Sequence, residues 1–346
     1  MIMAGHFLGA IKYSPDFSHS FITALAESRF GFLINESFWL TLFFVTSGYL
    51  LSLSEIDSFR SLILKSVKRF LRLGIPVLFS CAVIYVFILC VGLHNSETDA
   101  LFENTRLQAA FSVPLTLWRV LLSPIHVLVY NICTFNSPYW VLRDMLLNSL
   151  LIFLCLFLQS KTRTISWIKY VFICALVLFG FWKSYITISF TFGMVIAQHE
   201  QVIRRLFTSF RWLPLSLVAF TALLYFFFPA SILRILLFGV LIAAIPYIPL
   251  ADRILSRGIP QFLGKISFGI YSFHWPVFCS VGAWALLFFT PELGIWWAFA
   301  ISAVSSVATT LVLSFLYNLT LEKLSNQIIE KVIATIAAIP KRKNAT

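Results

Sequence analysis

Charged residues are scarce in this chain. Only 12% of its 346 residues are Asp, Glu, Lys or Arg, whereas a soluble domain averages about 25%. Apolar residues make up 60%, with 37 phenylalanines among them, and the mean hydropathy is +0.90. Water is therefore not the main solvent of this protein. That excludes a soluble enzyme, a disordered protein and a nucleic-acid-binding domain, and we expect no nucleic acid among its partners.

Motifs for metal and nucleotide chemistry are also missing. The sequence contains no GxSxG elbow, no HExxH and no Walker loop, and it lacks an Asp/His-rich metal set. Its six cysteines show no CxxC spacing and lie mostly inside apolar runs. We interpret them as small buried apolar residues rather than disulfides or metal ligands, and we expect no metal cofactor.

Long apolar runs, in contrast, fill the chain. A membrane-spanning helix needs about 20 mostly apolar residues, because about 30 Å of hydrocarbon is crossed at about 1.5 Å per residue. We find such runs near residues 36–54, 73–93, 139–159, 165–182, 183–198, 211–228, 230–249, 266–289 and 293–319. No second soluble domain, internal repeat or low-complexity segment interrupts them.

The first thirteen residues are apolar too, but Lys12, Pro15 and Asp16 soon end the run. About a dozen residues cannot cross a bilayer, and neither the basic start nor the cleavage site of a signal peptide is clear. Two interpretations stay open: a half-helix lodged among other helices, or the last part of a first span whose beginning is missing. We favour the second.

The distribution of Lys and Arg predicts the topology. With ten spans and a cytoplasmic N-terminus, 18 of the 26 basic residues fall on cytoplasmic segments and 5 on external ones. This bias is the positive-inside rule. We therefore predict an all-α, multi-pass membrane protein with about ten transmembrane helices and both termini cytoplasmic. The loop 94–138 then faces outward, as a cap with interfacial helices or as a re-entrant hairpin.

Histidines at membrane depth are functional candidates, because buried polar groups are costly there. His6 either hydrogen-bonds between helices or acts as a general base, since imidazole titrates near neutrality. Tyr271 and His274 are three residues apart and share a helix face, next to Trp275. An interfacial aromatic belt explains the tyrosine and the tryptophan but not the histidine.

Two charged groups complete the candidates. Lys65, Lys68, Arg69 and Arg72 share one helix face. Such a face attracts anionic lipid headgroups and also suits a phosphate-bearing ligand; the residues alone favour lipid. Near the start of a later span, Arg143 and Asp144 fit a snorkelling arginine and an acid stabilised by the helix N-terminus.

Five segments resemble the membrane-bound acyltransferase-3 family. FWLTLFFVTSGYLLS (38–52) resembles the FFVLSGFLIS signature of that family, and KRFLRLGIP its RRxxRLxP segment, with Arg69 and Arg72 at the RxxR pair. YWVLRDMLL (139–147) resembles its WxLxxE segment, with Trp140 at the Trp and Asp144 where Glu is usual. ISFGIYSFHWPVF (266–278) resembles its SYgiYLwHwP stretch, and LYNLTLEKL its closing Y…E-P segment without the proline. The matches follow the family order and cover essentially the whole chain.

The resemblance implies a function. Family members have about ten membrane helices and move an acyl group, usually acetyl from acetyl-CoA, onto hydroxyls of extracytoplasmic glycans such as O-antigen or exopolysaccharide sugars; other acceptors also occur. The first span of the family carries an arginine and, eleven positions later, a histidine thought to be catalytic. His6 and the following Phe7 fit the histidine end, whereas the arginine would precede Met1. This half-motif is a second reason to expect a truncated first helix.

The implied roles are specific. His6 is the expected catalytic base, acting either by deprotonating the sugar hydroxyl or by relaying the acyl group. Arg69 and Arg72, helped by Lys68, are expected to hold the phosphates of acetyl-CoA. The expected supporting residues are Trp140, Asp144, Tyr271 and His274.

The expected organisation follows from the same resemblance. We expect one acyltransferase domain over residues 1–320, a basic cytoplasmic tail over 321–346, and a location in the bacterial inner membrane. The expected partners are acetyl-CoA, a lipid-linked or polymeric glycan and membrane lipids. A transporter or flippase-like protein is the main alternative, although the inverted repeats of transporters are not visible; a non-catalytic partner in polysaccharide assembly is a third.

Overall fold

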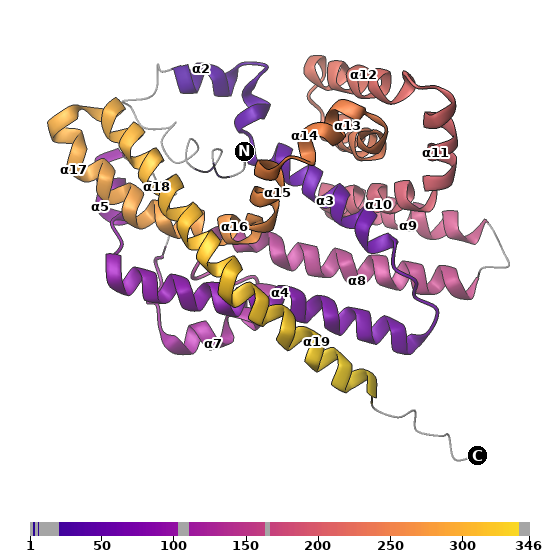
Figure 1. Cartoon of the computed structure of the whole chain (residues 1–346), viewed down its shortest axis with the longest axis horizontal. Helices are drawn as coiled ribbons and strands as arrows, with labels where there is room; N and C mark the ends of the chain where they lie inside the picture. The colour runs from indigo at the N-terminus through magenta and orange to yellow at the C-terminus, as the bar shows by residue number, and fades with distance from the viewer. Residues whose placement is uncertain (1–2, 4–5, 7–20, 103–110, 163–166, 339–346) are drawn as a thin grey trace.

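Helices are the only regular secondary structure in the described part of the chain (Figure 1). The computed structural model describes all residues except 1–2, 4–5, 7–20, 103–110, 163–166 and 339–346. Within these limits it contains no strand. The α-helices are α2 (Phe21–Glu27), α3 (Glu36–Ser52), α4 (Phe59–Val91), α5 (Asn95–Phe102), α7 (Leu117–Ile125), α8 (Trp140–Lys161), α9 (Ile168–Lys183), α10 (Tyr185–Gln198), α11 (Glu200–Ser209), α12 (Leu213–Phe227), α13 (Ser231–Ala244), α14 (Pro249–Leu255), α15 (Gly258–Lys265), α16 (Ser267–Val277), α17 (Ala283–Leu293), α18 (Ile295–Tyr317) and α19 (Lys323–Ala338). Short 3₁₀ turns cover Gly31–Ile34, Ser137–Tyr139 and Ile245–Tyr247, and π-turns cover His126–Tyr130, Phe278–Gly282 and Asn318–Glu322.

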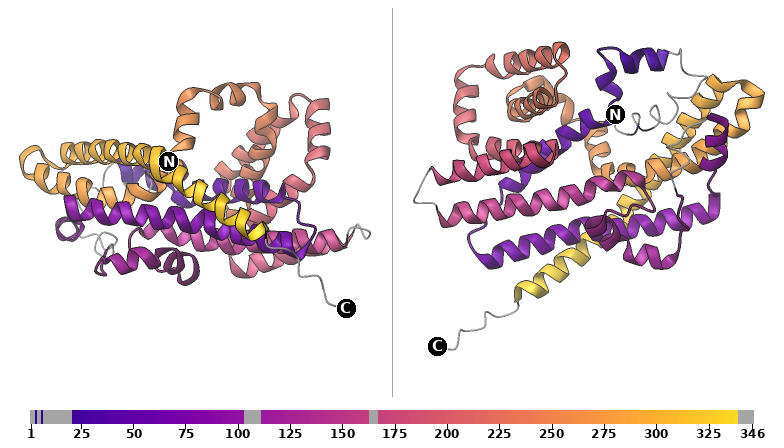
Figure 2. Two further views of the ribbon diagram at one scale, coloured as in Figure 1. Left: turned by 60° about the horizontal axis from the view of Figure 1, so that its bottom comes forward. Right: turned by 180° about the vertical axis from the view of Figure 1, so that it is seen from behind.

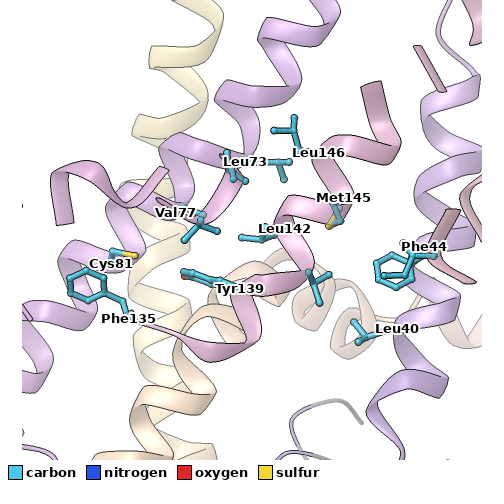
Figure 3. Close-up of a cluster of buried hydrophobic side chains, with 14 of the residues drawn as sticks. Leu40, Phe44, Leu73, Val77, Cys81, Phe135, Tyr139, Leu142, Met145 and Leu146 are labelled. Atoms are coloured by element: carbon cyan, nitrogen blue, oxygen red, sulfur yellow. The ribbon is translucent and has the colours of Figure 1, made fainter. Parts of the chain in front are cut away.

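The helices are arranged in layers. α4 and α8 lie side by side, α3 and α10 pack on α8, and α11 to α14 stand on the far side of α3 and α10 from α4 (Figures 1 and 2). The main core forms where α3, α4 and α8 meet (Figure 3). There Phe44 of α3, Val77 of α4 and Tyr139 beside α8 are fully buried. The buried hydroxyl of Tyr139 has a hydrogen-bond partner in that core, because it lies 2.6 Å from the buried Ser80 Oγ.

α4 is long enough to combine a membrane segment with an extramembrane one. Its N-terminus carries a reciprocal capping box between Ser58 and Ser61. It has 33 residues, so at about 1.5 Å per residue it is about 50 Å long, against about 30 Å of hydrocarbon. The apolar residues 73–91 can fill the bilayer while the basic first half projects beyond it.

Fewer helices qualify as membrane spans than the sequence predicts. Within the described residues, four are long and apolar enough, Phe59–Val91, Ser137–Lys161, Ser267–Leu293 and Ile295–Ala338, and the number rises to six if two bent pairs each count as one span. The bends, of 106° between α11 and α12 and of 89° after α13, lie within or beside runs that look continuous by hydropathy. α10 has only 14 residues, or about 21 Å. The protein is thus a multi-pass membrane protein with at least four candidate spans; ten spans and cytoplasmic termini stay predictions.

The close pairing of α3 with α10 depends on two glycines. Apolar helices gain little from burial in lipid, so close packing at small residues holds them together. A Cβ added at Gly193 of α10 would overlap the carbonyl oxygen of Val45, and one added at Gly48 of α3 would overlap that of Phe190. Both obstacles are backbone atoms, which cannot turn aside as a side chain can.

Gly193→Ala should therefore destabilise the protein. Overpacking against backbone typically costs about 1–3 kcal/mol, and the measurement is thermal unfolding of the purified protein in detergent. Gly264→Ala in α15 is the matched control, because an added Cβ there meets nothing within 4 Å. Equal melting temperatures for the two variants would contradict the close α3–α10 contact.

The C-terminal helices form one long rod that crosses α4 (Figures 1 and 2). α18 packs on α16 and α17 through small residues one turn apart, Ser302, Ser306, Thr310 and Ser314. Beyond the π-turn Asn318–Glu322 the rod continues as α19, which packs on α4. The expected boundary between residues 320 and 321 thus falls inside a helical rod; what the structure describes of the expected tail is helical as far as Ala338.

Two further sequence predictions have mixed outcomes. Cys81, Cys155 and Cys279 are buried as expected, but Cys90 and Cys174 are exposed, because each lies on the outer face of its helix.

The expected truncated first helix falls largely outside the described residues, which include only Met3 and His6 from that segment.

Candidate active site

A basic cavity of about 560 Å³ lies between α3, α4 and α8. All four cations of the predicted basic face line it, namely Lys65, Lys68, Arg69 and Arg72. Ser47 and Ser54 add hydroxyls, and Leu50, Met145 and Phe153 are among its apolar walls. The cations therefore surround a space rather than a flat surface.

Arg69 is the most firmly held of these cations. Its Nε donates a 2.9 Å hydrogen bond to Ser149 Oγ, and Ser149 is fully buried on α8. Because that bond fixes one edge of the guanidinium, the outer edge keeps a constant direction for pairing with two oxygens of an anion.

Lys68 and Arg72 pair instead with Glu330 of α19. The Glu330 carboxylate lies 2.9 Å from Lys68 Nζ and 3.7 Å from Arg72 Nη2. All three groups are partly exposed, so water and salt screen the pairs. A carboxylate from the C-terminal helix thus already contacts two of the cations expected to bind phosphate.

A second cavity, of about 540 Å³, lies between α3 and α16. It is largely apolar, with Trp39, Leu42 and Phe43 on α3 and Ile270 on α16. Tyr271 and His274 both line it, as their shared helix face predicts; Met3, Thr46 and Ser267 complete the wall. We call it the histidine cavity.

His6 lies beside this cavity and contacts three side chains, those of Glu36, His274 and Trp275. Its Nδ1 is 3.3 Å from Glu36 Oε1, and its ring centroid is 5.1 Å from that of His274 and 5.8 Å from that of Trp275. Glu36 is the first residue of α3, where Asn35 caps the helix and an acid is favoured by the helix dipole. A carboxylate on one nitrogen of an imidazole orients the ring and stabilises its protonated form.

His274 has a defined tautomer. Its Nδ1 lies 3.0 Å from the carbonyl oxygen of Ile270, which can only accept, so Nδ1 carries the proton. Its Nε2 is buried with no hydrogen-bond partner among the described residues, and so is Nε1 of Trp275. The site therefore offers an unused acceptor and an unused donor next to His6.

The other predicted supporting residues are placed differently. Tyr271 donates a 2.6 Å bond to the Pro138 carbonyl, which ties α16 to the start of α8. Trp140 is 38% exposed and lines neither cavity, whereas its neighbour Tyr139 is buried against Tyr271. Asp144 makes no ion pair among the described residues and lines neither cavity. Supporting roles for Trp140 and Asp144 stay predictions.

The motif segments meet in space although they are far apart in sequence. Tyr317, from the LYNLTLEKL segment, donates to the carbonyl of Pro76 in KRFLRLGIP at 3.1 Å. Tyr271 of ISFGIYSFHWPVF bonds the carbonyl of Pro138, the residue directly before YWVLRDMLL, and α3 contributes to both cavities. Within the described ranges, no three His, Cys, Asp or Glu side chains gather as metal ligands.

Comparison with known proteins decides the family. Residues 1–317 match the family model described as the acyltransferase domain, Acyl_transf_3. The chain belongs to the acyltransferase-3 family. No curated protein and no solved structure matches it. This family member is therefore a multi-pass membrane acyltransferase, and the two cavities are its candidate active site.

Three residues of this acyltransferase-3 site escaped the sequence analysis: Glu36, Ser149 and Glu330. Glu36 is an isolated acid at the start of an apolar run, and Glu330 follows two isoleucines and precedes Lys331. Both were visible as rare charges beside apolar segments, but their partners were not.

Proposed function

We propose that this chain transfers an acetyl group from cytoplasmic acetyl-CoA to a hydroxyl of an extracytoplasmic glycan, such as an O-antigen or exopolysaccharide sugar, in the bacterial inner membrane. The observation that carries the proposal is the arrangement along α3. The basic cavity lies along one half of this helix and the histidine cavity along the other, and Phe43 lines both. A donor with a phosphorylated end and a reactive thioester end matches that order.

The basic cavity suits the nucleotide end of acetyl-CoA. Arg69, held by Ser149, is the main phosphate ligand, with Arg72 and Lys68 beside it. Guanidinium groups bind phosphate oxygens through two parallel hydrogen bonds, and an ammonium adds a point charge. The pantetheine arm then extends past Phe43 toward the histidines.

The reaction needs one base and no redox chemistry. His6 takes the proton of the glycan hydroxyl while the hydroxyl oxygen attacks the thioester carbonyl. The C–O ester bond forms, the C–S bond breaks, and the proton passes from His6 to the departing thiolate, giving CoA with a free thiol. Glu36 orients His6 and stabilises the imidazolium formed in between.

His274 is suited to holding the acceptor. Its unprotonated Nε2 is buried beside His6, has no hydrogen-bond partner among the described residues and is available to accept one from a substrate hydroxyl. A sugar presents several adjacent hydroxyls, so one can donate to His274 while its neighbour meets His6. Satisfying a buried acceptor in this way favours a polyhydroxyl substrate over an apolar one.

The test is reconstitution of the full chain in proteoliposomes. With acetyl-CoA labelled in the acetyl group and a bacterial glycan as acceptor, we expect label in alkali-labile O-esters and an equal release of CoA thiol. O-acetyl signals in the NMR spectrum of the surface glycan from expressing cells should agree. Glycan movement across the bilayer without ester formation would instead support the transporter alternative.

Glu330→Gln should strengthen donor binding. The carboxylate of Glu330 competes with donor phosphates for Lys68 and Arg72, so its removal is expected to lower the KM for acetyl-CoA. Exposed ion pairs are weak, which limits the change to less than about fivefold. Glu322→Gln is the control, because Glu322 bonds Asn318 and no basic-cavity residue. A KM that rises in Glu330→Gln would contradict competition at this site.

A further inference from the structure

Arg234 of α13 is a buried cation without an anionic partner in the described part of the chain. It is only 8% exposed, and its Nε is buried with no hydrogen-bond partner. It forms no ion pair with any described residue, and its guanidinium lies over the ring of Tyr185, 5.1 Å from the ring centroid. Charged side chains inside a membrane protein are costly and normally have a partner, so Arg234 needs an anion that the described residues do not supply.

A cavity of about 260 Å³ lies next to this arginine, between α9, α10 and α13. Tyr185, which contacts the guanidinium, lines it. Ser231 and Ile235 of α13 line it too, and Ser231 shares a helix face with Arg234 because the two are three residues apart. Arg234 is thus linked to the cavity both by the ring that it contacts and by its position on α13.

Two helices begin at this cavity. Ser184 caps α10, Ser231 is the first residue of α13, and both line the cavity. A helix N-terminus carries a partial positive charge and N–H groups without intrahelical partners, and α13 has no side-chain cap. The end of α9 also reaches the cavity, but its Gly180 carbonyl already accepts the Ser184 N–H. None of the residues that line the cavity is acidic, so the site favours an anion.

The remaining walls indicate what kind of anion fits. Ile188, Ile232 and Ile235 are apolar, and Ile232 is 43% exposed. A free phosphate ion would leave these side chains against water. A phosphate that is esterified to a hydrocarbon chain would meet the cation with its head and cover the isoleucines with its chain.

We infer that Arg234 and the N-termini of α10 and α13 bind the phosphate headgroup of a membrane lipid. The phosphate supplies the missing counter-charge and accepts hydrogen bonds from the guanidinium, from the uncapped N–H groups and from the Ser231 hydroxyl. This lipid site shares no lining residue with the basic cavity or the histidine cavity. It goes beyond the proposed function and does not depend on it.

The test is lipid binding to the full chain, purified in a neutral detergent and stripped of lipid. The probe is radiolabelled dioctanoyl phosphatidic acid, compared with dioctanoylglycerol, which lacks the phosphate, and with inorganic phosphate, which lacks the chains. We expect the phosphatidic acid to bind at least about tenfold more tightly than either, since an unmatched charge or chain costs affinity of that order. Equally tight binding of inorganic phosphate or of dioctanoylglycerol would overturn the inference.

Arginine variants locate the bound lipid. Arg234→Met should weaken binding of phosphatidic acid by about 10- to 100-fold, the range for hydrogen bonds to a charged group. Arg204→Met is the matched control, because Arg204 is exposed on α11 and lines none of the three cavities; it should leave binding unchanged. Arg69→Met tests the basic cavity. If Arg69→Met weakens binding and Arg234→Met does not, the phosphate binds at the basic cavity and the inference is wrong.

Thermal unfolding separates this site from a purely structural arginine. Without lipid, Arg234 is an uncompensated buried charge, so Arg234→Met should melt no lower than the wild type. Phosphatidic acid should raise the melting temperature of the wild type but not that of the variant. If Arg234 only holds α10 to α13 through Tyr185, Arg234→Met melts lower and still binds the lipid, which overturns the inference. If Arg234→Met does not fold, Arg234→Gln replaces it, and unchanged lipid binding there overturns the inference as well.

Discussion

Replacing His6 with alanine should lower acetyl transfer by about 100- to 10,000-fold, the usual contribution of a general base. The variant loses the imidazole that is paired with Glu36 and that lies next to His274 and Trp275. Donor binding should survive, because the cations are at the other cavity. Labelled ester formation in proteoliposomes measures the rate, and O-acetyl NMR signals of the surface glycan give the result in cells.

The matched control for His6→Ala is His199→Ala. The His199 ring bonds the backbone carbonyl of Val195 near the end of α10 and lines neither cavity. We expect it to retain acetyl transfer. If His6→Ala gives the same O-acetyl NMR signals as the wild type, His6 is not the catalytic base. His274 would then be the next residue to replace.

Glu36 should affect the rate through His6. Glu36→Gln keeps the size of the side chain but removes the charge that stabilises the imidazolium, so we expect kcat to fall roughly tenfold, the effect of about 1.4 kcal/mol. The KM for acetyl-CoA should not change, and Glu36→Asp should restore part of the rate. A loss of protein from the membrane without this kinetic pattern would indicate a purely structural role.

Local periodicity was sufficient to predict which candidate residues of one helix point in the same direction. Lys65, Lys68, Arg69 and Arg72 share a helix face by spacing alone, and in the structure all four line one cavity. Tyr271 and His274, three residues apart, likewise line the other. A helix has only one way to place such residues, so their common direction follows from sequence.

The partners of those residues could not be predicted, because they come from distant segments. Lys68 and Glu330 are 262 positions apart, and Arg69 and Ser149 are 80 apart. An acid at the start of a helix, such as Glu36, is also favoured by the helix dipole alone. The residues around Glu36 therefore do not predict that it pairs with His6.

Hydropathy could not predict where the chain bends. It records how apolar a segment is, but it does not record direction. The chain turns by 106° between α11 and α12, and α12 itself has only 15 residues. Residues 211–228 are predicted as a span from their apolar composition, which says nothing of the bend that precedes α12.

Arg69→Ala should raise the KM for acetyl-CoA by about 10- to 100-fold. Hydrogen bonds to a charged partner contribute about 1.5–3 kcal/mol, and every 1.4 kcal/mol is about tenfold in affinity. The kcat should stay close to that of the wild type, since Arg69 lies in the basic cavity and not at the histidines. Initial rates over a range of acetyl-CoA concentrations, with a direct binding measurement on the same protein, separate the two constants.

Arg69→Lys and Arg60→Ala make this prediction specific. Lysine keeps the charge but loses the planar fork and the bond geometry to Ser149, so we expect Arg69→Lys to recover only part of the affinity. Arg60, on the same helix, bonds the Ala337 carbonyl of α19 and does not line the cavity, so Arg60→Ala should leave the KM unchanged.

The sequence also allowed the basic face of α4 to bind lipid headgroups. If Arg69→Ala and Arg60→Ala reduce membrane insertion equally and neither changes the KM, the cations of α4 bind lipid headgroups and the donor phosphates lie elsewhere.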